Sequence, residues 1–405
     1  MMRKVLTFVL SGGKGERLHP LTRDRAKPAV PFGGIYRIID FTLSNCINSG
    51  IRRIHVLIQY KSFSLQRHLI MGWNIFNSEL GEFIDVLPAQ QRIGSDWYKG
   101  TADAIYQNIY TIEDENPDEV LILAGDHIYK MNYYKMIDYH REMGADMTVA
   151  CVEMVKEKSP EVGVIEVDKK GYVEGFEEKP QNPKTIIGKP QSIYASMGIY
   201  VFNRQSLEEE LKEDAQKETD HDFGKNIIPQ MIGKGKKVSA YNFVDEKGRP
   251  QYWRDIGTRD AYYQANMELI KHNPEFDIYD KSWPIRTYQE QFPPAKSICA
   301  GKNHESCAGL ITDSLISGGC IIIGAKVQRS VLSPNVCIED GAEVADSILM
   351  EGVVVGKNSK IKNAIIDKKV IIPENSVIGY NLEEDRRGFT LTTSGIVLVA
   401  KKTHI

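Results

Sequence analysis

The chain has 405 residues, of which 42% are hydrophobic and 26% charged, a composition typical of a globular protein with roughly two or three domains. Its 51 Lys and Arg residues nearly balance its 54 Asp and Glu residues, and a net charge of −3 gives no bulk attraction to nucleic acid or to an anionic membrane. The first apolar run, Val5–Leu10, is too short to span a membrane and leads directly into Ser11-Gly12-Gly13, which favours a buried strand over a signal peptide. We therefore expect a cytoplasmic protein with neither a nucleic-acid nor a membrane partner.

From residue 1 to about 273, short apolar runs alternate with amphipathic stretches of helix length. One such stretch is Thr101–Asp114, where Ile105, Ile109 and Ile112 share one helical face. This alternation predicts a Rossmann-like, mostly parallel sheet covered by helices, whose ligands bind at the carboxyl ends of the strands. The predicted strands include Val5–Leu10, Ile54–Ile58, Val120–Leu123, Met147–Val152 and Ile199–Phe202.

A glycine-rich loop follows the first predicted strand, in the order Ser11-Gly12-Gly13-Lys14-Gly15-Glu16-Arg17. Glycines at a strand end let backbone N–H groups approach an anion closely. The spacing matches neither the Walker pattern nor the dinucleotide-binding pattern, so a simple tight turn is the alternative interpretation. Because Arg17 and the later Lys27 add cations near the same strand end, we expect a triphosphate site.

Two aspartates are candidate ligands of a metal ion. Asp126 comes shortly after the predicted strand Val120–Leu123, and Asp255 lies in the segment Trp253-Arg254-Asp255. Mg²⁺ binds one or two carboxylates together with phosphate oxygens and water. A helix cap or a turn is the alternative role for each aspartate. His127 is expected to be a packed neighbour, because one histidine alone is weak evidence for a metal site.

A hairpin is predicted from Val162–Val167 and Tyr172–Glu178, with a glycine-containing loop between them. It leads into Glu178-Lys179-Pro180. Lys179 could hold a phosphate monoester while Glu178 accepts hydrogen bonds from sugar hydroxyls. An exposed, charged strand end is the alternative interpretation.

The remainder of the chain has a different pattern. Prolines at positions 274, 284, 293 and 294 interrupt residues 274–305, which we interpret as a linker between a catalytic domain (1–273) and a second domain (306–405). The six cysteines form no CxxC pair, and we expect all of them to be reduced.

An internal repeat of 17 residues occupies residues 306–382. Aliphatic side chains recur in four columns with three faces per repeat, which predicts a triangular parallel β-helix with a continuous aliphatic core. Gly324, Gly341, Asn358 and Asn375 supply the backbone freedom for its corners, and Ile396–Ala400 is expected to add a further strand. The columns are Ile321, Ile338, Val355 and Ile372; Val327, Val344, Ile361 and Ile378; Leu332, Leu349 and Ile366; and Val336, Val353 and Val370.

Ten segments resemble bacterial glucose-1-phosphate adenylyltransferases, a branch of the sugar-phosphate nucleotidyltransferase family. The likeness covers nearly the whole chain, and three of the segments (97–104, 221–225 and 283–288) are the most specific to the adenylyl branch. The ten segments are Ser11–Leu18, Arg25–Val30, Phe32–Phe41, Leu43–Cys46, Leu87–Arg92, Trp97–Ala104, Leu123–Lys130, Ser196–Phe202, His221–Lys225 and Trp283–Tyr288.

The resemblance implies a reaction of ATP with α-D-glucose 1-phosphate to give ADP-glucose and diphosphate, the first committed step of glycogen synthesis. It also implies Mg²⁺, a homotetramer, allosteric control by glycolytic metabolites and a left-handed β-helix used for assembly and regulation. Carried over by motif, the ATP site comprises Gly12, Gly13, Lys14, Gly15, Arg17, Lys27, Gln59 and Gly100, and Asp126 and Asp255 bind the metal. Asp126, Arg17 and Lys27 are the catalytic residues, and Tyr98, Gly163, Glu178, Lys179 and Ser196 contact glucose 1-phosphate.

The sequence departs from the family pattern at Ser11 and Glu16, where Ala and Thr are usual, and at Asp24, where many members carry a basic residue associated with activator binding. Two alternatives to the main interpretation stay open: a non-catalytic regulatory subunit of the same enzyme, and a nucleotidyltransferase that uses another nucleoside triphosphate. A hexapeptide-repeat acyltransferase is disfavoured, because the sequence has no histidine between His304 and His404 to act as the base.

Overall fold

The computed structural model describes residues 4–90, 97–299 and 309–403. The chain folds into two compact units, each of which is described by itself. The first unit comprises Met1–Gly13, Phe41–Ser62 and Trp73–Trp253, and the second comprises Lys14–Asp40, Phe63–Gly72 and Arg254–Ile405. Residues 91–92 of the family-like segment Leu87–Arg92 and Cys307 lie outside the described residues.

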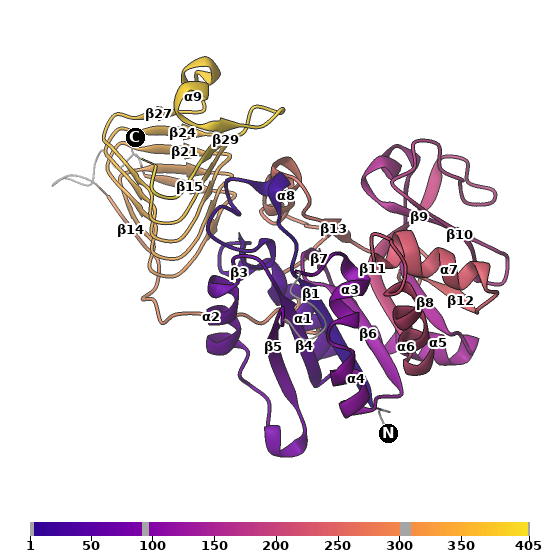
Figure 1. Cartoon of the computed structure of the whole chain (residues 1–405). Coiled ribbons are helices and arrows are strands. Elements are labelled where there is room, and N and C mark those ends of the chain that lie inside the picture. The colour runs from indigo at the N-terminus through magenta and orange to yellow at the C-terminus, as the bar shows by residue number, and fades with distance from the viewer. Residues whose placement is uncertain (1–3, 91–96, 300–308, 404–405) are drawn as a thin grey trace. The chain divides into compact units, whose positions relative to one another are not determined.

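A mixed sheet forms the centre of the first unit (Figure 1). Its central strands run parallel in the order β6-β1-β4-β5, and β11 joins this group antiparallel to β6. The predicted α/β fold is thus confirmed. The strands are β1 (Val5–Ser11), β4 (Arg53–Ile58), β5 (Phe83–Pro88), β6 (Glu119–Ala124), β8 (Met147–Val155), β9 (Gly163–Val167), β10 (Val173–Glu178), β11 (Ser192–Asn203) and β12 (Val238–Asn242).

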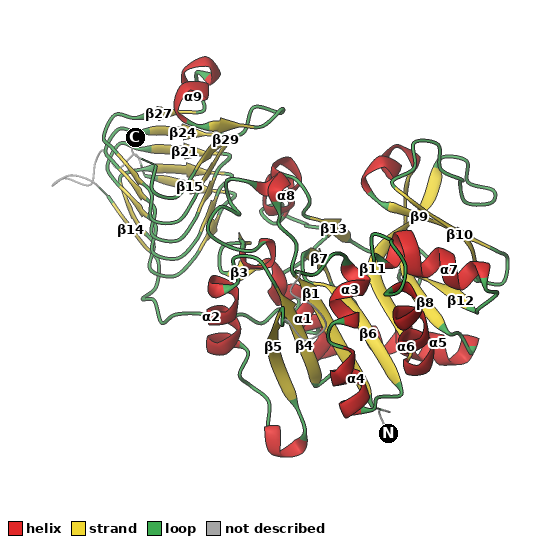
Figure 2. Cartoon of the chain, viewed as in Figure 1, coloured by secondary structure: helices red, strands yellow, loops and turns green. Residues whose placement is uncertain are grey.

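Helices cover this sheet because their apolar faces match the inward side chains of the strands (Figure 2). Leu6 and Phe8 of β1 share one buried cluster with Ala102, Ile112 and Leu211 from three helices. The helices of the first unit are α3 (Thr101–Tyr106), α4 (Ile109–Glu115), α5 (Tyr133–Met143), α6 (Arg204–Asp214) and α7 (Ile228–Gly233), and α1 (Ile38–Asn48) begins at the end of a second-unit segment. Shorter elements are the strand β7 (His127–Tyr129), the 3-10 helices η3 (Ser78–Leu80) and η4 (Lys156–Glu161), and the π-helix η5 (Phe223–Ile227).

The predicted helix over residues 101–114 is in fact two helices that meet at Asn108. The side-chain amide of Asn108 donates to the carbonyl oxygen of Ala104 at 2.8 Å, which is the acceptor that a continuous helix would offer to the backbone N–H of residue 108. The same amide also donates to the Tyr98 hydroxyl at 3.0 Å. The break therefore ties the helix to the segment that precedes it.

The predicted hairpin is confirmed, with β9 and β10 paired antiparallel. Asp168 closes the turn, because its Oδ1 accepts from the backbone N–H groups of Lys170 and Tyr172, each at 2.8 Å. The hairpin delivers Glu178 at the end of β10.

Three parallel sheets in the second unit form the faces of the predicted β-helix, whose stacked strands are visible in Figure 1. The first face contains β14 (Lys296–Ile298), β17 (Ile321–Ile323), β20 (Cys337–Ile338), β23 (Val354–Val355) and β26 (Ile371–Ile372). The second contains β15 (Leu310–Thr312), β18 (Lys326–Gln328), β21 (Glu343–Ala345), β24 (Lys360–Lys362) and β27 (Val377–Ile378). The third contains β16 (Leu315–Ile316), β19 (Val331–Leu332), β22 (Ile348–Leu349), β25 (Ala364–Ile366), β29 (Val397–Val399) and the antiparallel edge strand β28 (Thr390–Leu391).

The sequence repeat gives the core of the β-helix correctly except at one position. Ile322, and not Ile321, pairs with Ile338 and points inward, whereas Ile321 is 40% exposed. The first coil is one residue shorter than the later ones. This shifts the register of β17 by one residue, so Ile322 takes the inward position that the repeat predicts for Ile321. The predicted corners are confirmed, because Gly324, Gly341, Asn358 and Asn375 all have positive φ angles, between 51° and 71°.

The second unit also contains segments far from the β-helix in sequence. They are η1 (Glu16–Leu18), η2 (Lys27–Ala29), β2 (Pro31–Phe32), β3 (Tyr36–Arg37), α2 (Phe63–Gly72) and α8 (Arg259–Glu268), and α9 (Leu382–Gly388) lies near the chain end. The short strand β13 (Trp253–Asp255) marks the passage between the units. In the predicted linker, residues 274–295 contain neither helix nor strand, and β14 follows.

Among the five cysteines that the structure describes, the expectation of reduced thiols is wrong at one position. Cys299 is disulfide-bonded, while Cys46, Cys151, Cys320 and Cys337 are free thiols. The CxxC criterion could not identify Cys299 as a disulfide-bonded cysteine, because this criterion detects only cysteines that are close in the sequence. No helix in the described ranges is long and apolar enough to cross a membrane.

His55 on β4 gives the first unit a predictable acid sensitivity. Its ring packs between Phe8 and Phe83, with centroids 5.4 and 4.9 Å away, and burial lowers its pKa to about 4. The unfolded chain binds a proton at this site near pH 6.5, so stability is lost as the pH falls from about 6.5 to about 4, by about 3 kcal/mol in total.

We expect His55→Leu to remove this part of the pH dependence, measured as the free energy of unfolding at pH 7 and pH 4.5. His272→Leu, at an exposed position, is the matched control and should leave the dependence unchanged. Equal losses of stability on acidification in the wild type and in His55→Leu would contradict the assignment.

Candidate active site

The carboxyl ends of β1 and β4 bring three of the predicted site residues together. A Cβ atom added at Gly12 would lie 3.3 Å from Cβ of Gln59 and 3.9 Å from Cδ2 of Tyr98. A Cβ at Gly13 would meet nothing within 4 Å, so the space beside this part of the loop is open. Burial raises the pKa of Tyr98, so this phenol stays protonated and can donate a hydrogen bond at neutral pH.

Asp126 lies just beyond the end of β6, as expected for a ligand-binding carboxylate. The intervening Gly125 packs tightly against β1, because a Cβ there would lie 2.6 Å from Oγ of Ser11. His127 Nε2 lies 3.4 Å from Asp126 Oδ1, and its ring meets that of Trp253 edge to face at 4.9 Å. His127 thus packs against Asp126 and Trp253, and the Asp126 side chain is 30% exposed.

Four of the five predicted sugar-phosphate residues cluster around the β9–β10 hairpin, whereas Tyr98 lies beside Gly12. A Cβ at Gly163 would lie 3.0 Å from Oε2 of Glu178, so the backbone of Gly163 approaches this carboxylate closely. Lys179 Nζ lies 2.8 Å from Glu178 Oε1, and its side chain is 49% exposed. Lys179 has a φ of 51° and donates from its backbone N–H to the carbonyl of Val162 at 3.1 Å. Ser196 lies on the neighbouring strand β11.

The family-like segments 97–104 and 221–225 contact each other, which was not predicted from the sequence. Thr101 Oγ1 donates to Asp222 Oδ2 at 2.9 Å, and the backbone N–H of Ala102 donates to the carbonyl of His221 at 2.8 Å. A Cβ at Gly100 would lie 2.2 Å from the carbonyl oxygen of Asp220, so only glycine allows this approach. Gly100, predicted to lie near adenine, thus also has a packing role that no local sequence pattern shows.

The second unit gathers the cationic half of the predicted phosphate site. Gly15 has a φ of 65°, and its carbonyl accepts from Thr22 Oγ1 at 2.8 Å, while a Cβ at Gly15 would lie 3.2 Å from Cβ of Lys27. Lys27 is 8% exposed, and its Nζ lies 3.0 Å from Asp255 Oδ1.

Arg17 lies in the same neighbourhood. A Cβ added at Gly257 would lie 3.2 Å from Arg17 Nη2 and 2.7 Å from Asp255 Oδ2. Gly15, Arg17, Lys27 and Asp255 therefore come together within the second unit, and the Lys14 side chain is exposed. The two predicted metal ligands, Asp126 and Asp255, belong to different units, and their side chains are 30% and 28% exposed.

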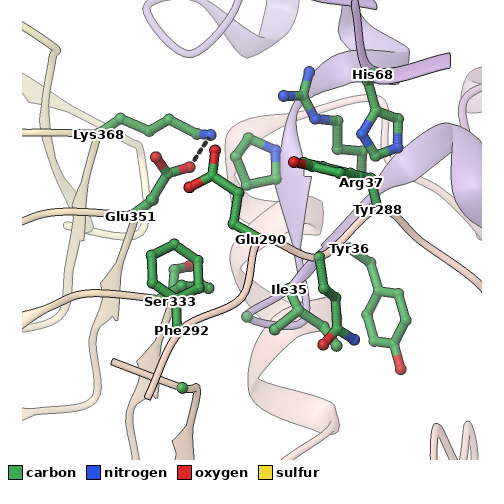
Figure 3. Close-up of a pocket in the computed structure, with 15 residues that line it drawn as sticks. Ile35, Tyr36, Arg37, His68, Tyr288, Glu290, Phe292, Ser333, Glu351 and Lys368 are labelled. Atoms are coloured by element: carbon green, nitrogen blue, oxygen red, sulfur yellow. Dashed lines mark hydrogen bonds and ion pairs between the residues drawn. The ribbon is translucent and has the colours of Figure 1, made fainter. Parts of the chain in front are cut away.

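A pocket of about 170 Å³ lies in the second unit, between the segment after the phosphate loop and the β-helix (Figure 3). Arg37 and His68 come from β3 and α2, and Lys368 and Glu351 come from the β-helix. Lys368 Nζ lies 2.6 Å from Glu351 Oε2, and burial lowers the pKa of Lys368 against the opposing effect of that carboxylate.

Arg37 and His68, on the other side of the pocket, are held in place by short contacts. Arg37 Nη1 donates to the backbone oxygen and to Oγ of Ser64, at 2.9 and 2.8 Å. His68 Nε2 lies 2.6 Å from Asp40 Oδ1. The pocket thus brings together Arg37 and Lys368, which are more than 300 residues apart in the sequence, with His68 and the carboxylates of Glu290 and Glu351.

Comparison with known proteins agrees with this arrangement. Residues 6–272 match the family model described as nucleotidyl transferase, and residues 293–399 match one described as GlmU-like, C-terminal hexapeptide. The chain belongs to the nucleotidyl transferase family. The second match agrees with the left-handed parallel β-helix predicted for the second domain, and the nucleotidyltransferase fold of the first half is likewise confirmed.

The relatives of this family member are similar over nearly their full length. The chain is 52% identical to the glucose-1-phosphate adenylyltransferase of Rhodopirellula baltica, with 99% of this chain and 91% of the relative covered. Proteins of the same name from Koribacter versatilis and Shewanella oneidensis are 51% and 52% identical, with 99% of this chain and 96% of each relative covered. The resemblance inferred from ten sequence segments is therefore confirmed.

Proposed function

We propose that this chain transfers the adenylyl group of ATP to α-D-glucose 1-phosphate, giving ADP-glucose, the glucosyl donor for glycogen synthesis, and diphosphate. The proposal rests mainly on one observation. Gly15, in the glycine loop after the first strand, lies close to Lys27, and Arg17 and Lys27 lie close to Asp255. The names of the relatives give the two substrates.

The chemistry needs no general base, because the attacking group is a phosphate oxygen that is already negatively charged at neutral pH (second pKa about 6). The protein must instead overcome the repulsion between two polyanions and align the attacking oxygen with the α-phosphorus. Backbone N–H groups of Gly12–Gly15 bind the phosphates of ATP, and Arg17 and Lys27 neutralise the departing diphosphate. Gln59 lies beside Gly12, where it can contact the adenine.

The sugar phosphate binds at the hairpin in this proposal. Lys179 donates to its phosphate, and Glu178 accepts from the sugar hydroxyls; the 2.8 Å contact between the two side chains supports a shared site. Tyr98, Gly163 and Ser196 complete the contacts. The Gly163 backbone lies against Glu178, and the Tyr98 ring lies beside Gly12, where the two substrates would meet.

Asp126 and Asp255 would hold Mg²⁺. Both are carboxylates with partly exposed side chains, which is the donor chemistry that this hard cation takes. When bound, the ion supplies positive charge to the phosphate oxygens. Lys27 Nζ lies 3.0 Å from Asp255 Oδ1, so an ammonium group stands beside one of the two proposed metal ligands.

Regulation and assembly belong to the same proposal. A phosphorylated glycolytic metabolite would bind in the pocket between Arg37 and Lys368, where its anionic groups would replace Glu351 as the partner of Lys368. We also propose a homotetramer, because the outer face of the β-helix exposes Ile321, Ile371 and Val377. The substrates are cytoplasmic metabolites, which supports a cytoplasmic location.

The activity is tested by steady-state kinetics of the purified chain with glucose 1-phosphate, Mg²⁺ and each of ATP, UTP, dTTP and GTP. We expect ATP to give the highest kcat/KM, and Asp126→Asn to lower kcat roughly 100-fold or more, as expected for loss of a central electrostatic element. Asp118→Asn, at the exposed amino end of the same strand, is the matched control and should retain activity.

Three results would contradict the proposal. No ADP-glucose from the purified chain would favour the regulatory-subunit alternative, and a preference for UTP or dTTP would change the nucleotide. Near-normal kcat with intact Mg²⁺ dependence in Asp126→Asn would remove Asp126 from the mechanism.

The effector pocket is tested with fructose 1,6-bisphosphate as a representative glycolytic phosphate ester. We expect Lys368→Ala to raise the concentration needed for half-maximal change in rate by about tenfold, because a partly buried charge-assisted contact is lost. Lys362→Ala, at an exposed position on β24, should have no effect. An unchanged response in Lys368→Ala would exclude this pocket as the effector site.

A further inference from the structure

A buried ion pair connects the segment after the phosphate-binding loop to the β-helix within the second unit. Arg25 Nη2 donates to both carboxylate oxygens of Asp367, at 2.7 and 3.0 Å. The two residues are 342 positions apart in the sequence and are only 5% and 2% exposed. Neither side chain is therefore open to solvent or to a substrate.

The surroundings of the pair leave its two partners little freedom. Asp367 follows β25 in the β-helix, and its Oδ1 also accepts from the backbone N–H of Lys368 at 2.7 Å. Arg25 Nη1 lies 3.7 Å from the sulfur of Met350. A charge without its partner would be costly here, because burial removes the water that could solvate it.

Arg25 stands two residues before Lys27, the cation that contacts Asp255. Ala26, which lies between them, is 3% exposed and is the N-cap residue of the short helix η2, whose first residue is Lys27. Because only the buried Ala26 separates Arg25 from Lys27, fixing Arg25 also restricts the position of the Lys27 side chain.

The chain after Lys27 is fixed from another element. Tyr262 on α8 donates from its hydroxyl to the carbonyl of Pro31 at 2.7 Å, and Asn266 Oδ1 accepts from the backbone N–H of Gly33 at 2.8 Å. This helix begins four residues after Asp255, so it holds both the Lys27 segment and the carboxylate that Lys27 contacts. The amino-terminal side of Lys27 is held by the β-helix through Arg25.

We propose that Asp367 is a positioning residue for the reaction: through Arg25 it sets the place of Lys27, so that the β-helix forms part of the triphosphate site. Asp367 acts through Arg25 and touches no substrate. The effect should therefore fall on ATP, whose diphosphate end Lys27 neutralises, and not on glucose 1-phosphate. This inference rests on the proposed function of Lys27.

The test compares Asp367→Asn with Asp346→Asn. Asp346 also receives both donors of an arginine, Arg329, at 2.6 and 2.8 Å, but this pair lies at the surface of the same β-helix. We expect Asp367→Asn to raise the KM for ATP and lower kcat by about tenfold each, since small displacements of a positioned group have effects of this size. The KM for glucose 1-phosphate should change less than twofold, and Asp346→Asn should behave as the wild type.

A second variant separates positioning from stability. Arg25→Met with Asp367→Leu replaces the pair by apolar side chains, which commonly restores stability at a buried site. We expect its thermal unfolding temperature to recover while the KM for ATP stays raised, because the directional contact to Arg25 is absent.

Three outcomes would overturn the inference. The first is that Asp367→Asn has the same kinetics as Asp346→Asn. The second is that Asp367→Asn changes the KM for ATP and the KM for glucose 1-phosphate equally. The third is that the apolar double variant recovers full activity. If the wild type makes no ADP-glucose, the proposed function fails separately. Calorimetric ATP binding then decides the inference, with about tenfold weaker binding expected for Asp367→Asn only and equal binding contradicting it.

Discussion

ATP and glucose 1-phosphate each carry several negative charges, and their approach is opposed by repulsion that grows as water is excluded from the site. The roles proposed for the glycine loop, Arg17, Lys27 and the two metal-binding aspartates all reduce this repulsion. Lys27 is almost completely buried, and its Nζ lies 3.0 Å from Asp255 Oδ1. The glycine loop adds backbone N–H groups, which bring partial positive charge without the bulk of a side chain. Positive charge at fixed positions is thus the contribution of the fold to the reaction.

The glycine loop crosses from one compact unit of the chain to the other. Gly12 and Gly13 belong to the sheet-containing unit, whereas Gly15, Arg17 and Lys27 belong to the unit that contains the β-helix. The β-helix has an aliphatic core of its own, and the buried pair of Arg25 and Asp367 ties the segment that contains Lys27 to it. A rigid repeat domain can therefore serve catalysis as a support, in addition to any role in assembly and regulation.

Features set by local periodicity could be predicted from the sequence, including the strands of the first sheet, the hairpin and the columns of the β-helix. The exceptions arise where one residue changes the local pattern. Asn108 breaks a helix by bonding to Ala104, and a shorter first coil places Ile322 in the core instead of Ile321. Contacts such as Arg25 with Asp367 join residues 342 positions apart, and no spacing rule in a single sequence can reveal them.

The central claim is that charge neutralisation, and not proton removal by a side chain, drives the reaction. It is tested most directly by the dependence of kcat on pH at saturating Mg²⁺ and substrates. The account predicts that kcat rises with ionisation of the sugar phosphate near pH 6 and then stays constant to about pH 9. A further rise between pH 7 and 9 that disappears in His127→Gln would reveal a general base and contradict the account.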